Sequence, residues 1–283
     1  MYEKVNMFHP DKVADRIAGA IVDKAYFLRQ NPHIAVEVLI GHEQASVIVE
    51  SDCGIMEQMV KDIIDRIAGK QKKYSIKIES QDEKLNLIQR KKVRCGDNGI
   101  FRGMPVTDEQ RLLTKICDEL ECSDGKYIIE KTLNGYDIII CQSKMDEREI
   151  RAQVFETLLP YEIHQVAINP IGYWEGGLNV DSGATNRKLG SDMGNAVTGG
   201  GLHGKDLSKA DVSVNIMCHI LAQKHDSPIK TTCGIGDDNI EFVVIPTGQK
   251  IAMDYEDVVK EAYKWLMKEY GSFEKFAERG LIK

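Results

Sequence analysis

The segment from Gly199 to Asp211 holds glycines, lysines and a carboxylate within thirteen residues. Three consecutive glycines lack a Cβ, so the backbone there can approach an anion closely. Lys205 and Lys209 can supply positive charge to phosphate oxygens, and the Asp211 carboxylate is a hard oxygen ligand that suits Mg²⁺. The segment therefore predicts a site for a polyphosphate and its metal ion.

A second candidate site begins at His9, which is followed by Pro10, Asp11 and Lys12 at the start of an expected helix. Pro10 suits the first helical turn, where its missing N–H costs nothing. Asp11 complements the positive end of the helix dipole, which would explain an isolated aspartate. A histidine and an aspartate together at a helix N-terminus also suit a site for phosphate and Mg²⁺, so both interpretations stay open.

Other polar groups stand at informative places in the chain. Arg187 and Lys188 shortly precede the glycines, which favours phosphate binding over an ordinary exposed pair. The run Gly96–Gly99 contains an aspartate and would also be explained as a turn. Glu37 and Glu50 lie in apolar β runs, where an unpaired buried carboxylate would be costly.

The elements that must position these residues recur in the order helix, two strands, helix, strand. The first pass is expected at 10–28, 34–40, 45–50, 55–68 and 74–79, and the second at 107–117, 126–131, 136–141, 146–159 and 165–169. The third is expected at 208–223, 229–235, 239–245 and 254–269. A period of about a hundred residues predicts an α+β fold of three pseudo-threefold repeats, each a sheet with helices on one face.

Composition bounds the class of protein. The net charge of −7 over 283 residues argues against a general nucleic-acid binder. No apolar run is long enough to cross a bilayer, and the start of the chain lacks the apolar stretch of a signal peptide. Seven cysteines without a Cys-x-x-Cys pair predict reduced thiols in a cytoplasmic protein.

Together the motifs resemble those of S-adenosylmethionine synthetases (methionine adenosyltransferases), of which this would be a short, divergent member. The resemblance rests on five motifs in the same order: His9–Lys12, Gly96-Asp97-x-Gly99, Ile168–Pro170, Asp181 to Lys188, and Gly199–Asp211. It implies three intertwined βαββαβ repeats, with approximate boundaries 1–95, 96–170 and 171–283. It also implies that the sulfur of L-methionine attacks C5′ of ATP and expels triphosphate, which is then hydrolysed to phosphate and pyrophosphate.

The resemblance further implies roles for individual residues. The catalytic residues would be His9, Lys126, Arg187 and Lys205. ATP would contact His9, Asp124, Lys126, Tyr173 or Trp174, Asp181, Arg187, Lys188, Leu202 and Lys205. Methionine would contact Glu50, Gln81, Asp97, Asp181 and Lys209. Asp11 and Asp211 would bind two Mg²⁺ ions, and Glu37 would bind K⁺.

The family's active site lies between two subunits, so the resemblance implies a homodimer; whether two dimers pair into a tetramer stays open. One subunit would give the His9, Lys126 and Arg187 groups, and the other the Glu50, Asp97 and Lys205 groups. The interface would be a flat, largely apolar sheet face. Neither a nucleic acid nor a membrane is an expected partner.

The chain departs from the family at several places. Met7-Phe8 replaces the usual Glu-Gly, Asn98 replaces Gln, and His203 stands where a small residue is usual. The stretch between Gln81 and Asp97, where the family has a mobile loop, is shortened and rich in charge, which predicts weaker closure over the substrates.

Two alternatives are weighed against the synthetase. The spacing Gly199-x₄-Gly204-Lys205 fits the opening of a P-loop phosphotransferase motif, but Asp206 replaces its Ser/Thr, and 191–198 is a poor buried strand. The other alternative is an inactive homologue that binds nucleotide or regulates a full-length partner.

Overall fold

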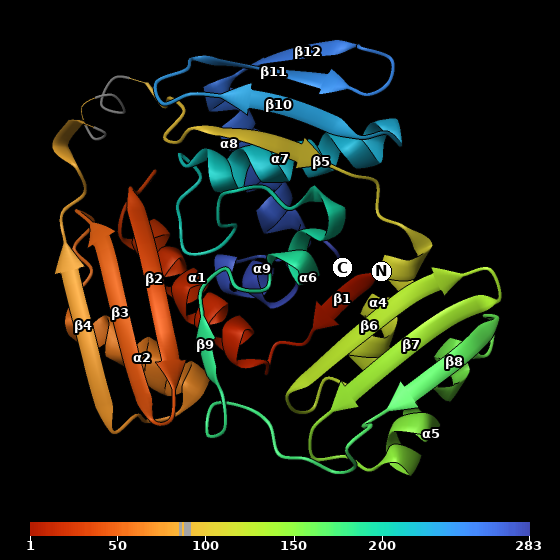
Figure 1. The fold of residues 1–283 in the computed structure, drawn as a ribbon. Coiled ribbons are helices and arrows are strands. Elements are labelled where there is room, and N and C mark those ends of the chain that lie inside the picture. Colours follow the sequence, from red (N-terminus) through yellow and green to blue (C-terminus); the bar gives the residue numbers. More distant parts are fainter. Residues whose placement is uncertain (85–86, 88–91) are drawn as a thin grey trace.

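The computed structural model describes residues 1–84, 87 and 92–283, and within them the strands form three four-stranded sheets (Figure 1). The first sheet has the order β4 (Lys73–Glu79), β3 (Gln44–Ser51), β2 (Ile34–Gly41), β9 (Ser182–Ala184). The second has the order β1 (Tyr2–Val5), β6 (Gly125–Thr132), β7 (Gly135–Gln142), β8 (Ile163–Ile168). The third has the order β12 (Lys250–Asp254), β11 (Asn239–Val244), β10 (Ile229–Cys233), β5 (Gly99–Gly103).

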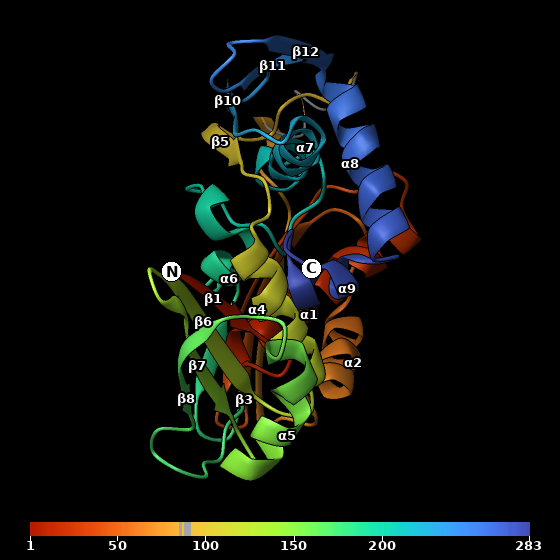
Figure 2. The same ribbon diagram turned by 90° about the vertical axis from the view of Figure 1, so that its right-hand side faces the viewer.

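Each sheet carries its helices on one face, as the sequence predicts. The pairs are α1 (Pro10–Leu28) and α2 (Glu57–Ala68), α4 (Asp108–Glu119) and α5 (Glu147–Leu158), and α7 (Ala210–His225) and α8 (Tyr255–Glu269). The short helices are α6 (Leu189–Met193), the 3₁₀ turn η1 (Gly194–Ala196) and α9 (Phe273–Arg279), and α9 packs on α1. Figure 2 shows α2, α8 and α9 along one side of the molecule. The α+β fold is therefore confirmed.

The expected element order is confirmed in the first two repeats and wrong in the third. In the first two, a helix connects the last two strands, so β3 with β4 and β7 with β8 pair in parallel. In the third, a tight turn with Gly248 at φ 73° joins β11 directly to β12, so this pair is antiparallel. Helix α8 then follows the last strand instead of preceding it, and α9 ends the pattern.

The repeats are intertwined through short edge strands, one for each sheet. β9 pairs with β2, β1 pairs with β6, and β5 pairs with β10. Each edge strand comes from a distant part of the chain, so every sheet draws residues from beyond the boundaries expected at 95 and 170. The boundaries themselves stay a prediction.

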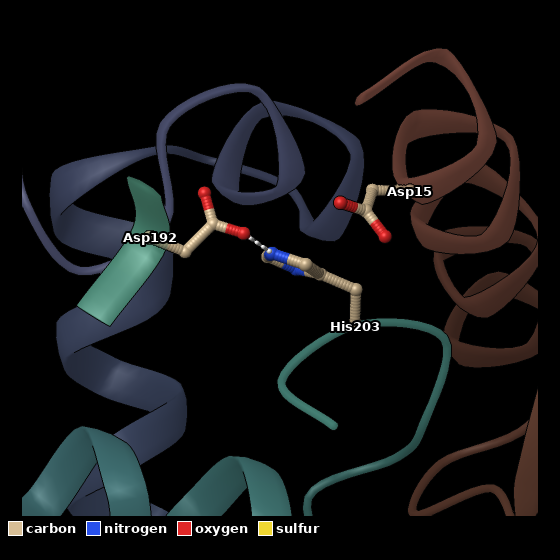
Figure 3. Close-up of side chains that lie close together, drawn as sticks. All are labelled: Asp15, Asp192 and His203. Carbon is tan, nitrogen blue, oxygen red and sulfur yellow. Dashed lines mark hydrogen bonds and ion pairs between the residues drawn. The ribbon is translucent and has the colours of Figure 1, made fainter. Parts of the chain in front are cut away.

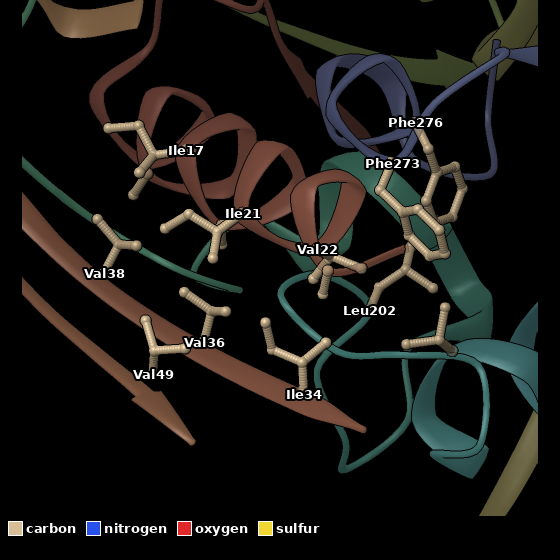
Figure 4. Packing of buried hydrophobic residues seen from close by; sticks show 14 of the residues in the cluster. Ile17, Ile21, Val22, Ile34, Val36, Val38, Val49, Leu202, Phe273 and Phe276 are labelled. Carbon is tan, nitrogen blue, oxygen red and sulfur yellow. The ribbon is translucent and has the colours of Figure 1, made fainter. Parts of the chain in front are cut away.

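The largest core lies between α1 and the first sheet (Figure 4). Ile17 and Ile21 on the helix face Val36, Val38 and Val49 on the strands, and all are buried. Burying one such side chain stabilises the fold by about 1.5–3 kcal/mol. Leu202, Phe273 and Phe276 join the same core, so it also fixes the glycine-rich segment and α9.

The opposite faces of the sheets are exposed in this single chain. Apolar side chains there include Leu39 and Ile48 on the first sheet, Ile139 on the second and Ile100 on the third, each at least 40% exposed. They stand among charged residues such as Glu37 and Lys77. Among the residues described, no helix has the length and apolar character that a bilayer crossing needs.

Candidate functional site

The first group of candidate residues gathers at the N-terminus of α1. His9 is the N-cap, and its Nδ1 accepts the Asp11 N–H at 3.2 Å. Asp11 is buried, and its Oδ1 accepts the Ala184 N–H at 2.9 Å. β9 can come this close because Gly183 has no Cβ; an added one would lie 1.9 Å from the Pro10 carbonyl oxygen.

The segment after β9 brings two cations to the same aspartate. Arg187 Nε lies 3.6 Å and Lys188 Nζ 3.1 Å from the Asp11 carboxylate. Burial, together with the positive charge of Lys188, lowers the pKa of His9 to about 4. The imidazole is therefore neutral at pH 7 and can donate one hydrogen bond while Nδ1 accepts another.

The start of β6 and the segment before β9 add the remaining members of this group. Asp124 accepts the Gly177 N–H at 2.8 Å, and burial raises its pKa to about 6. Lys126 on β6 forms an ion pair with Glu3 at 2.9 Å. Asp181 acts electrostatically on both His9 and Asp124. The His9 cluster is defined as His9, Asp11, Asp124, Lys126, Asp181, Arg187 and Lys188.

The two aromatic candidates for an adenine contact lie differently. Tyr173 is 61% exposed, and its hydroxyl donates to Glu175. Trp174 is partly buried, and its indole N–H donates to Asn169 Oδ1 at 3.2 Å. A Cβ built on Gly176 would lie 2.7 Å from Asp124 Oδ2 and 2.8 Å from Trp174 Cζ3, so the indole and the carboxylate lie beside one small gap.

A second group surrounds the glycine-rich segment. Lys205 Nζ lies 2.5 Å from Asp211 Oδ2, in a hollow of about 450 Å³ that Asp97 and the glycines 199–201 also line. Burial, with a smaller contribution from the nearby Asp97 carboxyl group, raises the pKa of Asp211 to about 6 despite the opposing positive charge of Lys205. A Cβ on Gly200 would lie 1.8 Å from Asp211 Oδ1. Only a glycine therefore lets the backbone lie this close to the Asp211 carboxylate.

Glu50 belongs to the second group through the register of the first sheet. The Val36 N–H donates to the Gly204 carbonyl at 2.7 Å, which places Lys205 opposite Ala35 at the edge of β2. Ala35 in turn lies opposite Glu50 on β3. Directly opposed residues of antiparallel strands share a face, so Lys205 and Glu50 lie on one face, about 10 Å apart between backbones. The Lys205 cluster is defined as Glu50, Asp97, Lys205 and Asp211.

Two predicted methionine contacts are buried with unsatisfied polar atoms. Gln81 Oε1 and Lys209 Nζ have no hydrogen-bond partner among the described residues, although Lys209 Nζ lies 4.0 Å from Asp206 Oδ2. Leaving a buried polar atom without a hydrogen bond costs about 1–3 kcal/mol, so both atoms suit a polar ligand.

Two other candidates have restricted roles. The Leu202 side chain is 1% exposed and packs in the core, so only its main chain could reach ATP. Glu37 is exposed on the first sheet and accepts the Thr185 hydroxyl.

Three side chains that the sequence did not single out as a group lie close together in the interior (Figure 3). Ligand atoms of Asp15, Asp192 and His203 lie within 4.8 Å of one another, and this is the one such group found in the described part of the chain. Lys12 Nζ lies 2.8 Å from both Asp192 carboxylate oxygens and 3.2 Å from Asp15 Oδ2. The lysine ammonium thus supplies the positive charge between these carboxylates, which argues against a metal ion there.

The predicted Mg²⁺ ligands therefore belong to different clusters, Asp11 to the first and Asp211 to the second. Both are buried carboxylates, which are hard oxygen donors of the kind that Mg²⁺ prefers. The glycines 199–201, here called the glycine cradle, line the same hollow as Asp211, so the surroundings of Asp211 fit a metal-bound phosphate.

Within the described ranges, no hydrogen bond or ion pair links a member of the His9 cluster with one of the Lys205 cluster. The first lies where α1 meets β9 and β6, and the second where the glycine-rich segment meets β2 and the residues before β5. The P-loop alternative lacks its preceding strand, because α6 and η1 stand before the glycines.

The charged stretch expected to act as a shortened loop falls partly on 85–86 and 88–91, outside the described residues. Its described end is held by the third sheet. Lys92 Nζ lies 2.6 Å from Asp254, and Arg94 Nε lies 3.0 Å from Asp238.

Comparison with known proteins gives consistent matches. The family described as S-adenosylmethionine synthetase, N-terminal domain, matches residues 1–91. An S-adenosylmethionine synthase of Mycoplasma capricolum is 24% identical, with 93% of this chain and 84% of the relative covered. That of Acholeplasma laidlawii is 27% identical, with coverage of 82% and 76%. The solved structure of an unusual S-adenosylmethionine synthetase from Campylobacter jejuni has the same fold, with a TM-score of 0.74, 20% identity, and 99% and 93% coverage.

Proposed function

We propose that the chain is a short, divergent methionine adenosyltransferase of the S-adenosylmethionine synthetase family. We further propose that its two clusters are the halves of one active site, which a second copy of the chain completes. In the proposed reaction the methionine sulfur attacks C5′ of ATP and triphosphate departs. Triphosphate is then hydrolysed to phosphate and pyrophosphate. No covalent intermediate with the protein is needed, so its work is alignment and stabilisation of charge.

The His9 cluster would hold the nucleotide. Arg187 offers a planar fork of donors and Lys188 a point charge to the triphosphate oxygens. The neutral imidazole of His9 would donate a hydrogen bond to the oxygen that leaves C5′. Between the two aromatic candidates we assign adenine to Trp174, because it lies beside Asp124 while Tyr173 points to solvent.

The Lys205 cluster would complete the triphosphate site from the partner chain. Lys205 adds positive charge, and the glycines let backbone N–H groups face the anion. Mg²⁺ held by Asp11 and Asp211 would neutralise phosphate charge. The assignment of K⁺ to Glu37 stays a prediction.

Methionine would bind at the end of the first sheet. Gln81 Oε1 and Lys209 Nζ, which lack hydrogen bonds within the described part of the chain, suit the ammonium and carboxylate groups of an amino acid, respectively. Glu50 and Asp97 would add negative charge toward the ammonium group. Desolvating these groups around the thioether would keep water from competing with the sulfur.

The single observation that carries the proposal is the separation of the candidate residues into two clusters. The same division is expected if each subunit of a homodimer contributes half of each site. The exposed sheet faces, with Leu39 and Ile48 among charged residues, are the surfaces we assign to that dimer. Pairing of dimers into a tetramer would be an additional interface.

Product analysis tests the activity. The chain is incubated with ATP, L-methionine, Mg²⁺ and K⁺, and the products are separated by chromatography. S-adenosylmethionine with phosphate and pyrophosphate supports the proposal. ADP would indicate a kinase, and no turnover would indicate an inactive binding protein.

Subunit mixing tests the shared site. His9→Ala and Lys205→Ala homodimers should each be inactive. Random mixing gives a heterodimer with one intact site, so roughly a quarter of wild-type activity should return. No recovery in verified heterodimers would contradict a site shared between chains.

A further inference from the structure

The buried group around Asp192 includes a sequence neighbour of each cluster, Lys12 next to Asp11 and His203 near Lys205, and takes no part in the proposed chemistry. His203 Nε2 lies 2.9 Å from Asp192 Oδ2, and both side chains are at most 1% exposed (Figure 3). Lys12 joins both residues, and Asp15 accepts from Lys12 on the other side. The network therefore fixes the ring of His203 in one orientation.

A second set of hydrogen bonds connects His203 to the segment that carries Arg187 and Lys188. The His203 N–H donates to Asn186 Oδ1 at 2.9 Å, and Asn186 Nδ2 donates to the His203 carbonyl at 3.2 Å. The Asn186 N–H donates to Asp15 Oδ1 at 2.7 Å. Asn186 has φ 63°, a conformation that asparagine tolerates better than most residues.

These contacts bridge two segments that are far apart in sequence. Asn186 directly precedes Arg187 and Lys188, and His203 stands two residues before Lys205. The cations of the two clusters are therefore connected to a common buried group, although no hydrogen bond or ion pair joins the clusters directly within the described residues.

We propose that His203 is a positioning residue, which through Asp192 and Asn186 sets the placement of the triphosphate-binding cations in both clusters of one chain. This inference rests on the proposed function. Because the two clusters of a chain serve different active sites of the proposed dimer, the anchor also ties the geometry of one site to that of the other. It gives a role to a histidine at a position where the family usually has a small residue.

A purely structural role is the competing explanation, since the His203 ring also packs edge-on against Phe276, with centroids 5.3 Å apart. His219 provides a matched control. It packs in the same way against Trp265 at 5.6 Å and has no carboxylate partner among the described hydrogen bonds.

The test measures binding of inorganic tripolyphosphate with Mg²⁺ by calorimetry, together with kcat, KM and Tm. His203→Leu should weaken tripolyphosphate binding by about 10-fold or more and lower kcat by about 10- to 100-fold, because small displacements of aligned groups are costly. His203→Gln retains an N–H toward Asp192 and should stay within about 3-fold of wild type. His219→Leu should lower Tm without changing either functional value.

Asn186→Gly keeps the backbone conformation and removes the side-chain hydrogen bonds to His203. It replaces His203→Leu in the test if that variant does not fold, and it should show the same loss of tripolyphosphate binding. Wild-type binding and kcat in folded His203→Leu or Asn186→Gly would overturn the inference, and so would equal losses in the Leu and Gln variants. If the wild-type chain itself fails to bind tripolyphosphate, the proposed function is wrong, and the inference is wrong with it.

Discussion

Replacing Lys12 with methionine should destabilise the chain more than any exposed lysine change. The Lys12 side chain is fully buried, and its ammonium contacts Asp192 and Asp15. Methionine is unbranched and flexible enough to fill the space, so the substitution removes chiefly the charge. The two carboxylates then remain in the interior, with ligand atoms within 4.8 Å of each other and without their main cation.

The magnitude follows from the loss of one partner in a buried ion pair, which costs about 3–5 kcal/mol. For a chain of this size each kcal/mol shifts Tm by about 2 °C, so Lys12→Met should melt about 6–10 °C lower at pH 7.5. Lys24→Met, on the same helix but partly exposed, should cost less than about 1 kcal/mol.

The cost should also depend on pH. Burial opposes ionisation of Asp192, but Lys12 and His203 outweigh it and lower its pKa. In the wild type, Asp192 therefore contributes stability that is present above its unfolded pKa and lost as pH falls below it. In Lys12→Met, burial dominates and the pKa rises, so the variant regains stability as pH falls from 7.5 to 5.

Urea unfolding at pH 7.5 and 5.0, at matched protein concentration, measures both effects. The difference in unfolding free energy between wild type and Lys12→Met should be smaller at pH 5.0. Adding Asp192→Asn to Lys12→Met should recover part of the loss, and the double variant serves if the single one is insoluble. A deficit below about 1 kcal/mol at pH 7.5, or one equal at both pH values, would refute the reasoning.

Three further outcomes concern the Lys205 cluster. Gly200→Ala should abolish most turnover because its Cβ would meet Asp211 at 1.8 Å, whereas Gly199→Ala, with open space around it, should retain activity; equal kcat values would contradict the glycine cradle. The rise in Tm caused by Mg²⁺ should be full above pH 7 and shrink as pH falls through about 6, where Asp211 takes up a proton; a constant rise from pH 7.5 to 5 would remove it as a ligand. Lys205→Ala should lower kcat by roughly 10²- to 10³-fold through lost charge opposite the triphosphate, and unchanged turnover in the folded variant would exclude that role.

Strong periodicity and turn signals explain which elements could be predicted. α1 is found at the expected residues 10–28, because Pro10 marks its start and apolar residues recur at helical spacing. The hairpin of β6 and β7 follows from its Asn134-Gly135 signal. The edge strands β1, β5 and β9 were missed because they have only four, five and three residues, too few to show a period, and their partners lie far away in sequence.

The candidate site was predictable only as far as local motifs reach. Motif spacing pointed to Asp11, Arg187 and Lys188, and tertiary contacts bring them together. The ion pair between Lys12 and Asp192 joins residues 180 positions apart, so neither local sequence predicts it. The sequence marks His203 only as an unusual residue at its position; the contact with Asp192 gives the physical reason for a histidine there.

The exchange of edge strands bears on synthesis at the ribosome. β2 emerges with the first third of the chain, but β9, which covers part of its edge, is not translated until residue 182. An uncovered strand edge readily pairs with other chains. The nascent polypeptide must therefore carry this uncovered edge while residues 42 to 181 are added, roughly half of its elongation. Slow translation, or crowding of ribosomes on one message, is then a hazard for its folding.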